Sequence, residues 1–402
     1  MWQLWFCSCH IIVSIVSVKR IQACYIHSVI IPPVNTKQRC YILSQENCTT
    51  VKQPDTIKVA TFNLCNYLEP PYAFYDFENI YSAEQWQKKQ NWIINYLSEH
   101  QPDVIGFQEV FSPESLQQLV KSQGFPYFAV IDEAKLVDDY IYQSPVVAIA
   151  SRYPIKATSP VQANAELATA MGLYDNFQFS RQPLRATIDV PHFGLCDCYV
   201  VHFKSKRPTD PTVNETKTAD KDNTDTDESV IKAFTAEISG GWASSIQRGS
   251  EAALLLTAII ERRAQSGNPI LLMGDFNDNL HDGVLQHLLI QTVRNRSQGG
   301  INQLLAPYRL KDSWALYQAA TQNQDNDGIP PKQRAYSHYF GSKGSVLDYI
   351  LLSCEFDTEY QESLAEVSCY HTYDRHLINP IYEQDSQSTD HAVVMISLTL
   401  LS

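Results

Sequence analysis

The sequence predicts an α+β fold, a four-layer α/β/β/α sandwich in which two facing, mostly antiparallel or mixed sheets lie between outer helices. Three observations predict it. Short apolar segments of strand length outnumber helical segments, helical segments intervene between them repeatedly, and 402 residues with 44% hydrophobic content are enough for a large core. Two facing sheets with helices outside bury both kinds of segment.

The first regular elements follow a long irregular N-terminal segment. Residues 58–65 (KVATFNLC) alternate as a half-buried strand does, and residues 83–99 (AEQWQKKQNWIINYLSE) place their apolar side chains at helical spacing. Further helices are predicted over residues 113–122 and 248–267, and further strands over residues 102–110, 145–155, 184–190, 197–205, 269–277, 345–353 and 392–400.

Residues 1–54 are predicted to be an extension outside the fold, and residues 55–402 to form one folded domain. Residues 2–18 are an apolar run followed at once by Lys19 and Arg20. The run is shorter than the ~20 residues of a spanning helix and lacks the basic start of a secretory signal. Three interpretations stay open: a signal or membrane anchor, a mis-chosen translation start, and a structured extension. The first predicts a secreted, periplasmic or membrane-anchored protein, and the second a cytoplasmic one.

Residues 207–241 are predicted to be an acidic loop inserted into the domain. They combine eight acidic side chains with many threonines and asparagines, which is the composition of a loop or a disordered segment. Two interpretations are open, a solvated surface loop and a mobile flap over a site.

The formal net charge of −13 is unevenly distributed, because residues 1–54 carry five basic side chains against one acidic side chain. The rest of the chain is therefore strongly acidic and repels polyanions at long range. This argues against a stable DNA-binding module. It argues less against an enzyme that contacts phosphate through a metal ion.

Cysteine spacing gives little support to a zinc site. Five of the ten cysteines lie in the first fifty residues, and no CxxC pair occurs anywhere in the chain. Most of the later five are expected to be buried thiols, which leaves the redox compartment open.

Polar side chains recur where the predicted strands end. A lone acid beside a strand is usually a turn former, but six strand ends with such groups are harder to explain in that way. Burial of several like charges is prohibitive unless a cation neutralises them. The residues concerned are Asn63, Glu109, His202, Asp275, Asn277, Asp348, Asp390 and His391.

The ligand chemistry favours a hard cation. Carboxylate and amide oxygens without thiolates favour Mg²⁺, Mn²⁺ or Ca²⁺ over zinc. Mg²⁺ keeps several waters and is typically shared with phosphate, so one or two carboxylates are enough. The sequence thus predicts a metal ion that polarises a phosphoryl oxygen.

The motifs at these strand ends resemble those of the endonuclease/exonuclease/phosphatase superfamily, the deoxyribonuclease-I-like fold. They occur in the family's order and extend over roughly residues 57–400. "GDFN" alone is moderately specific, whereas six motifs in order make chance an implausible account. The motifs are TFN (61–63), QEV (108–110), HFKSK (202–206), GDFND (274–278), LDYIL (347–351) and TDH (389–391).

The resemblance implies the metal ligands first. Glu109 resembles the principal ligand of Mg²⁺, with Asn63 beside it as a metal and substrate contact, and Asp390 resembles a further carboxylate on the metal side.

The resemblance also implies the catalytic groups. His391 resembles the catalytic histidine and Asp348 its orienting partner, because a carboxylate on one ring nitrogen fixes the tautomer and raises basicity at the other. Asp275 resembles the residue that positions or deprotonates the attacking water, and Asn277 one that binds a phosphate oxygen.

Several residues are expected to contact the substrate. His202 resembles a second histidine at the scissile phosphate, and the lysines after it favour this role over that of a core imidazole. Lys204 belongs to the same motif, Arg181 is either a cleft residue or a surface ion pair, and Ser337 resembles a small hydroxyl residue of the family.

The motifs most resemble bacterial, often secreted, nucleases of this superfamily. The resemblance implies a Mg²⁺-dependent nuclease that hydrolyses DNA by in-line attack of water. The alternatives are a phosphatase or phospholipase-type phosphodiesterase acting on inositol phosphate or sphingomyelin, and an inactive binding protein. We expect a monomer with a nucleic acid substrate, no stable protein partner and, if the N-terminal run is an anchor, membrane association.

Overall fold

The computed structural model describes residues 56–174, 177–209, 227–281, 283–293, 301–322 and 333–401. The chain divides into two compact units, Met1–Glu46 and Asn47–Ser402, and all described residues belong to the second unit. The predicted extension over residues 1–54 lies outside the described residues, so its nature stays a prediction.

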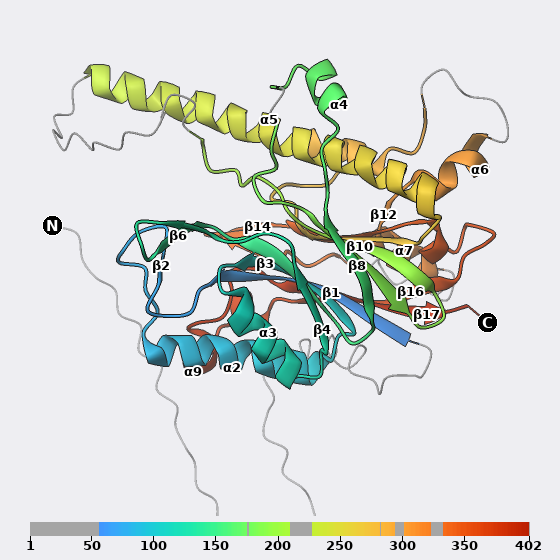
Figure 1. Cartoon of the computed structure of the whole chain (residues 1–402), viewed down its shortest axis with the longest axis horizontal. Coiled ribbons are helices and arrows are strands. Elements are labelled where there is room, and N and C mark those ends of the chain that lie inside the picture. The colour runs from blue at the N-terminus through green and yellow to red at the C-terminus, as the bar shows by residue number, and fades with distance from the viewer. Residues whose placement is uncertain are drawn as a thin grey trace, which may run out of the picture. The chain divides into compact units, whose positions relative to one another are not determined.

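Two six-stranded sheets form the centre of the second unit (Figure 1). The first sheet has the order β16 (Ala365–Tyr373), β17 (Val393–Leu400), β1 (Thr56–Tyr67), β3 (Val104–Val110), β7 (Val146–Ser151) and β4 (Tyr127–Val130). The second has the order β12 (Lys311–Asp312), β15 (Asp348–Leu352), β11 (Ile270–Asp275), β10 (Gly194–His202), β9 (Leu184–Val190) and β8 (Ile155–Pro160).

Both sheets are mixed, as the sequence predicts. β1 pairs with β3 in parallel, β10 pairs with β11 in parallel, and the other pairs within the two sheets are antiparallel. Each parallel pair is joined by a helical crossover, α2 (Ala83–His100) in the first sheet and α5 (Asp227–Ser266) in the second.

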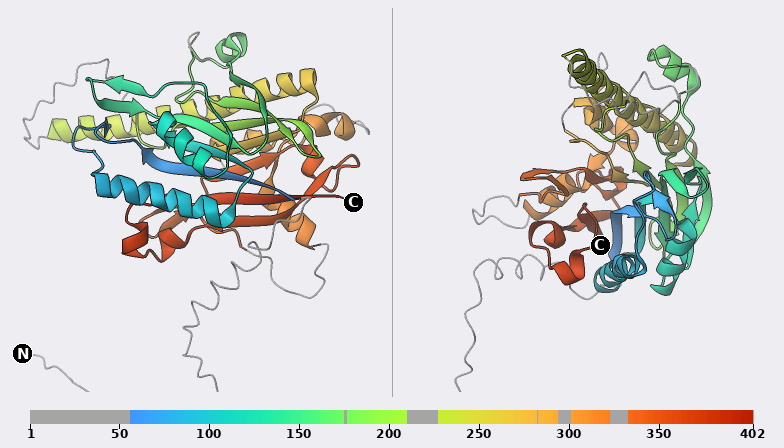
Figure 2. Two further views of the ribbon diagram at one scale, coloured as in Figure 1. Left: turned by 60° about the horizontal axis from the view of Figure 1, so that its bottom comes forward. Right: turned by 90° about the vertical axis from the view of Figure 1, so that its left-hand side faces the viewer.

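Three apolar layers hold the sandwich together, which confirms the predicted four-layer fold. Inward side chains of the two sheets form the central layer, for example Val59 against Met273 and Val200. α2 and α3 (Pro113–Ser122) cover the first sheet, and α5 covers the second (Figure 2). Burial of these faces from water is the main stabilising contribution.

The strand period of two determines which residues face the space between the sheets. On β1, Ile57 and Val59 lie in the central layer, whereas Ala60, Phe62 and Leu64 pack toward α2. The same alternation holds on β10, β11 and β15, where every second residue faces the other sheet.

α5 begins earlier than the sequence indicates. The prediction of a loop as far as residue 241 is wrong for residues 227–241, because the helix starts at Asp227, and residues 210–226 lie outside the described part. Asp227 and Glu228 in the first turn favour a helix start through the helix dipole. Gly240 is needed at a close approach, since a Cβ there would lie 2.6 Å from the Thr209 carbonyl oxygen.

Smaller elements complete the described structure. β2 (Ala73–Phe74), β6 (Ile141–Ser144) and β5 (Lys135–Val137) form a three-stranded sheet, and β13 (His338–Phe340) pairs with β14 (Lys343–Ser345). The remaining helices are α4 (Ala165–Ala170), α6 (Ile301–Leu305), α7 (Ser313–Gln322), α8 (Arg375–Ile378), α9 (Tyr382–Asp385), and the 3-10 helices η1 (Gly283–Leu289), η2 (Ala306–Tyr308) and η3 (Cys354–Phe356).

Two further observations bear on the sequence predictions. Within the described ranges, no helix combines the length and the apolar character needed to traverse a lipid bilayer. Cys369 is disulfide-bonded, whereas Cys65, Cys196, Cys198 and Cys354 are free thiols, and the last three of these are buried.

Candidate active site

Strand register brings three of the predicted site residues side by side on the second sheet. His202 at the end of β10 is the register partner of Asp275 on β11, and Asp275 is the partner of Asp348 on β15. All three follow the inward alternation of their strands, so they point toward the first sheet and are almost fully buried. Gly274 permits this pairing, because a Cβ there would lie 2.0 Å from the Val201 carbonyl oxygen.

The first sheet supplies Asn63 and Glu109 from the other side. Asn63 lies on the inward face of β1, in register with Gln108 of β3. Regular alternation would turn Glu109 away, toward α2, with Ile105 and Phe107. A register shift between Phe107 and Val110 and a positive φ of 59° at Glu109 interrupt the strand, and Glu109 Oε1 lies 3.5 Å from Asn63 Nδ2.

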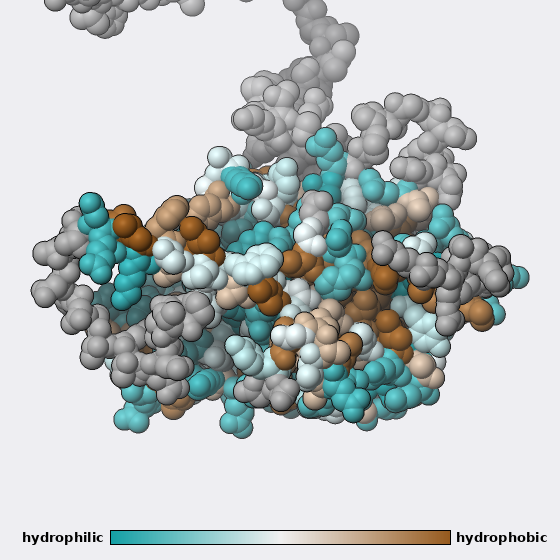
Figure 3. All heavy atoms as spheres, turned by 90° about the horizontal axis from the view of Figure 1, so that it is seen from above, coloured by the Kyte–Doolittle hydropathy of each residue, from teal (hydrophilic) through white to brown (hydrophobic). Residues whose placement is uncertain are grey.

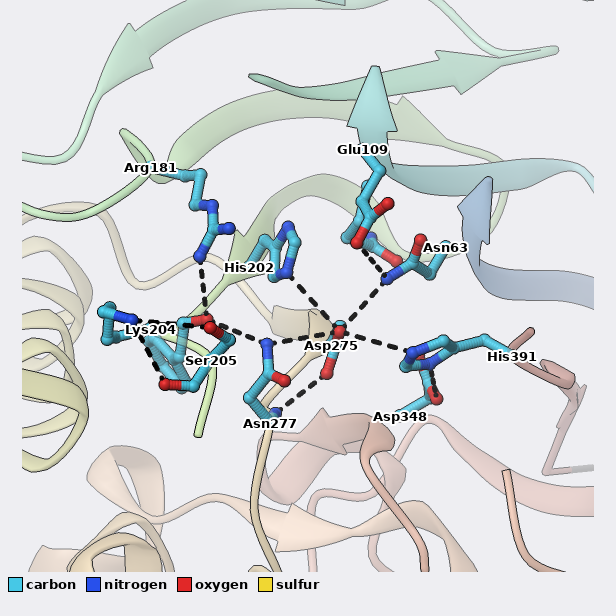
Figure 4. A network of polar contacts seen from close by, with 12 residues as sticks. Asn63, Glu109, Arg181, His202, Lys204, Ser205, Asp275, Asn277, Asp348 and His391 are labelled. Atoms are coloured by element: carbon cyan, nitrogen blue, oxygen red, sulfur yellow. Dashed lines mark hydrogen bonds and ion pairs between the residues drawn. The ribbon is translucent and has the colours of Figure 1, made fainter. Parts of the chain in front are cut away.

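Asp275 is the centre of the polar network (Figure 4). Its Oδ2 accepts a hydrogen bond from Asn63 Nδ2 at 3.1 Å and lies 3.5 Å from His202 Nε2 and 3.8 Å from His391 Nε2. Its Oδ1 accepts from the Asn277 backbone N–H at 2.8 Å. Residues from both sheets and from the C-terminal region thus converge on one carboxylate.

His391 is held in a fixed orientation. Its Nδ1 lies 2.8 Å from Asp348 Oδ2, and its backbone N–H donates to the Thr389 hydroxyl. The buried Oγ of Ser337 accepts hydrogen bonds from the backbone N–H groups of Leu347 and Asp348, which fixes the backbone at Asp348. Ser337 therefore lies beneath the site, although the sequence predicts it as a substrate contact.

Burial and neighbouring charges shift the pKa values of these groups in different directions. Burial by itself would lower the pKa of His391, but the carboxylates of Asp348 and Asp275 raise it well above its ordinary value. Burial raises the pKa of Asp275 to about 7, although the nearby His391 opposes the shift. Burial, with Arg181 and His391 close by, holds the pKa of His202 well below its ordinary value. The site therefore pairs a cationic imidazole with a neutral one around a carboxylate.

A cationic side lies across Asp275 from His391 (Figure 4). Arg181 Nη1 donates to the Phe203 carbonyl at 3.4 Å, and Lys204 follows His202 by two residues. Burial and the neighbouring Arg181 lower the pKa of Lys204, as expected for two cations close together. Asn277 Nδ2 donates to the same Phe203 carbonyl at 3.0 Å, so the predicted phosphate-binding amide also fixes this loop.

Asp390 lies next to His391 and completes the set of predicted residues. Two groups of described residues place one ligand atom each within 4.8 Å of the others: Asp275 with Asp348 and His391, and His338 with Asp390 and His391. Glu109 belongs to neither group and lies on the Asn63 side of Asp275. These side chains can hold a divalent metal ion, since their donors are carboxylates and imidazoles.

One protein-family model matches most of the chain. The model of the endonuclease/exonuclease/phosphatase family covers residues 60–366. The chain belongs to this family. It is accordingly a hydrolase that acts on phosphoester bonds. The match contains the positions of Asn63, Glu109, His202, Asp275 and Asp348, whereas Asp390 and His391 follow it in sequence and join the site through the fold.

Solved structures of family members show limited likeness to the chain. The human Nocturnin catalytic domain is 16% identical with a TM-score of 0.49, over 87% of this chain and 97% of that chain. A family protein from Beutenbergia cavernae is 15% identical with a TM-score of 0.45, over 86% and 72% of the two chains. One from Bacteroides thetaiotaomicron is 14% identical with a TM-score of 0.43, over 87% and 96%. No curated protein sequence matches the chain.

Two buried residues of α5 that sequence analysis does not assign to the site hold its cationic side in place. The buried Glu251 of α5 accepts hydrogen bonds from the backbone N–H groups of Ser180 and Lys204, each at 2.7 Å. Arg248, one turn earlier, donates to Asp278 at 2.9 Å and to the Lys204 carbonyl at 3.1 Å. The only sequence signal is their spacing at i and i+3, which places them on one helix face.

Proposed function

We propose that the protein is a Mg²⁺-dependent nuclease that hydrolyses DNA by in-line attack of water on phosphate. One observation carries the proposal: Asp275 lies between the His391–Asp348 pair and the cationic side formed by Arg181 and Lys204. Groups that move protons and groups that bind a phosphate therefore flank the same carboxylate.

The donor set fits a hard divalent cation. Glu109, Asn63 and Asp390 offer carboxylate and amide oxygens, which Mg²⁺ prefers. The pKa of Asp275 is raised because its carboxylate is buried, close to those of Asp348 and Glu109. A bound cation would offset the unfavourable free energy of burying these charges. When bound, the ion supplies Lewis-acid polarisation of a phosphoryl oxygen.

The chain's own residues supply the rest of the proposed mechanism. Ionised Asp275 orients the attacking water and accepts its proton. Asp348 keeps the His391 ring in place, and protonated His391 stabilises charge that develops on the phosphoryl group. His202, whose Nε2 lies 3.5 Å from Asp275 Oδ2, contacts the scissile phosphate or its leaving group in this proposal.

The choice of a nucleic acid substrate rests on local charge, and the choice of DNA on the resemblance of the motifs to nucleases. The chain carries a formal net charge of −13, yet Arg181, Lys204 and Arg248 lie close together on one side of the site. A cationic cluster in an acidic protein gives a polyanion one place to bind.

A phospholipid phosphodiesterase is the second candidate, and exposed apolar side chains on α5 favour it. Figure 3 looks down on the side that carries α5 and shows apolar side chains among polar ones toward the end where α5 begins. Four large side chains there are more than half exposed: Ile231, Phe234, Ile238 and Trp242. Such a face would suit contact with a lipid surface.

We also propose that the protein works outside the cytoplasm. The disulfide at Cys369 supports this location, because disulfides persist mainly in oxidising compartments. Immunodetection of the protein in culture medium or a periplasmic extract tests the proposal, and its retention in the cytoplasm would contradict it.

A substrate panel tests the proposed activity. Purified protein is incubated with plasmid DNA, single-stranded DNA, RNA, inositol phosphates and sphingomyelin vesicles, each with Mg²⁺ and with Mg²⁺ plus EDTA. We expect EDTA-sensitive DNA cleavage that His391→Ala abolishes. Hydrolysis of sphingomyelin or inositol phosphate without cleavage of any nucleic acid would refute the nuclease and retain the family chemistry.

A further inference from the structure

His338 lies directly beside the catalytic candidate His391. The two residues form an isolated antiparallel bridge, and the Ala392 backbone N–H donates to the Ser337 carbonyl at 2.7 Å. The centroids of the two imidazole rings are 4.9 Å apart, at an interplanar angle of 47°. Backbone pairing therefore fixes the separation of two side chains that are 53 positions apart in the sequence.

A carboxylate and a thiol lie next to this imidazole pair. One ring nitrogen of each histidine and one Asp390 oxygen lie within 4.8 Å of one another. The thiol of Cys65, a free and half-buried cysteine, hydrogen-bonds to the Asp390 carboxylate. Cys65 adopts a positive φ of 53°, and the Tyr81 hydroxyl donates to its carbonyl oxygen at 3.2 Å. The Cys65 sulfur contacts Asp390 but is not grouped with the two imidazoles.

These donors differ chemically from the oxygen donors that suit Mg²⁺. Two imidazoles with a carboxylate are borderline ligands, which suit Zn²⁺ and its neighbours in the first transition row. Glu109, an oxygen donor next to Asn63, is not grouped with His338 and His391.

We propose that His338, Asp390 and His391 form a second metal site for a divalent transition-metal ion such as Zn²⁺. Occupation of this site inhibits hydrolysis, because it engages the imidazole of His391. The binding proposal stands without the proposed function, whereas the inhibition rests on the role of His391 in it.

Cobalt binding tests the site without any activity measurement. Co²⁺ substitutes for Zn²⁺ and absorbs visible light when nitrogen ligands bind it at low coordination number. Wild-type protein saturated with Mg²⁺ is titrated with Co²⁺, and the same titration is made with His338→Phe and the surface control His192→Phe. We expect the absorbance to saturate in the wild type and the control, and the apparent Co²⁺ affinity to fall at least tenfold in His338→Phe.

Zinc inhibition gives the second readout. With the substrate that the panel identifies and excess Mg²⁺, the Zn²⁺ concentration for half inhibition should rise at least tenfold in His338→Phe, while the rate without Zn²⁺ stays within about twofold. If His338→Phe does not fold, as judged by thermal melting, His338→Gln takes its place. Equal Co²⁺ affinity in the wild type and the His338 variant, or equal Zn²⁺ sensitivity, would overturn the second site. An inactive protein that still shows the His338-dependent Co²⁺ spectrum would refute only the proposed function.

Discussion

The two sides of the cleft are built in different ways. On the His391 side, Asp275, Asp348 and Asn63 extend from paired strands, and their positions follow from sheet register. On the cationic side, Arg181 and Lys204 lie on segments that follow or precede strands and are held by Glu251 of α5. The first side is fixed by the sandwich itself, whereas the second is held by side-chain hydrogen bonds to loop backbone, those of the buried Glu251 and Arg248 among them.

This structural difference predicts different functions for the two sides. Groups that move protons need fixed geometry, and strand ends in a packed sandwich provide it. Groups that bind an extended substrate can lie on loops, which here are held in place by side chains of α5. Changes on the first side should therefore affect turnover, and changes on the second should affect substrate binding.

The largest effect is expected from the imidazole of the first side. His391→Ala should lower kcat by about 10²–10⁴-fold, because general acid–base groups typically contribute that much. The measurement is initial-rate kinetics on the substrate identified by the panel, with thermal melting to verify folding. The exposed His192 supplies the matched control, and His192→Ala should leave kcat unchanged. A loss below tenfold in His391→Ala would remove this residue from the chemistry.

The second largest effect is expected in the pH dependence of the rate, through the ionisation of Asp275. Burial raises the pKa of this group to about 7, and only its ionised form accepts a proton from water. The rate should therefore fall about tenfold per pH unit below about pH 7 and level off above it. A bound metal ion would move the midpoint to lower pH, so the profile is recorded at several Mg²⁺ concentrations. A flat profile between pH 5 and pH 8 at every Mg²⁺ concentration would contradict the role of Asp275.

A smaller effect should come from the anchor of the cationic side. Glu251→Gln replaces one carboxylate oxygen by an NH₂ group, which cannot accept from Ser180 or Lys204. The loss of one hydrogen bond to a charged group costs about 1.5 kcal/mol, so KM should rise roughly tenfold while kcat changes little. Glu261→Gln, at an exposed position of the same helix, is the control. A fall in melting temperature with unchanged KM would make Glu251 a purely structural residue.

The smallest effect is expected at the rim of the cationic side. Lys206 forms an ion pair with Asp278 at 2.7 Å, but its side chain is 57% exposed. Exposed ion pairs contribute about 0–1 kcal/mol, so Lys206→Ala should change KM by less than about fivefold. The same kinetic assay with Lys204→Ala gives the comparison, because Lys204 lies deeper and should have the larger effect. Equal effects of the two lysines would mean that depth in the cleft does not determine binding.

The sequence by itself determined the layers and most of the catalytic side. Alternation on β1, β10, β11 and β15 is visible in the apolar pattern, and it already places Asn63, His202, Asp275 and Asp348 on inward faces. The polar ends of these strands predict a site at one end of the sandwich, because a period of two is a local property of an extended chain. The family motifs predict the same residues.

Tertiary structure alone decided three features. Glu109 enters the cleft through a bulge with a positive φ, against the alternation of its own strand. Glu251 reaches the cationic side because α5 crosses the ends of distant segments, and His338 meets His391 through a bridge between β13 and the start of the last strand. Local patterns cannot specify such contacts, because each depends on the packing of segments far apart in the chain, and that packing is settled by burial of the whole core.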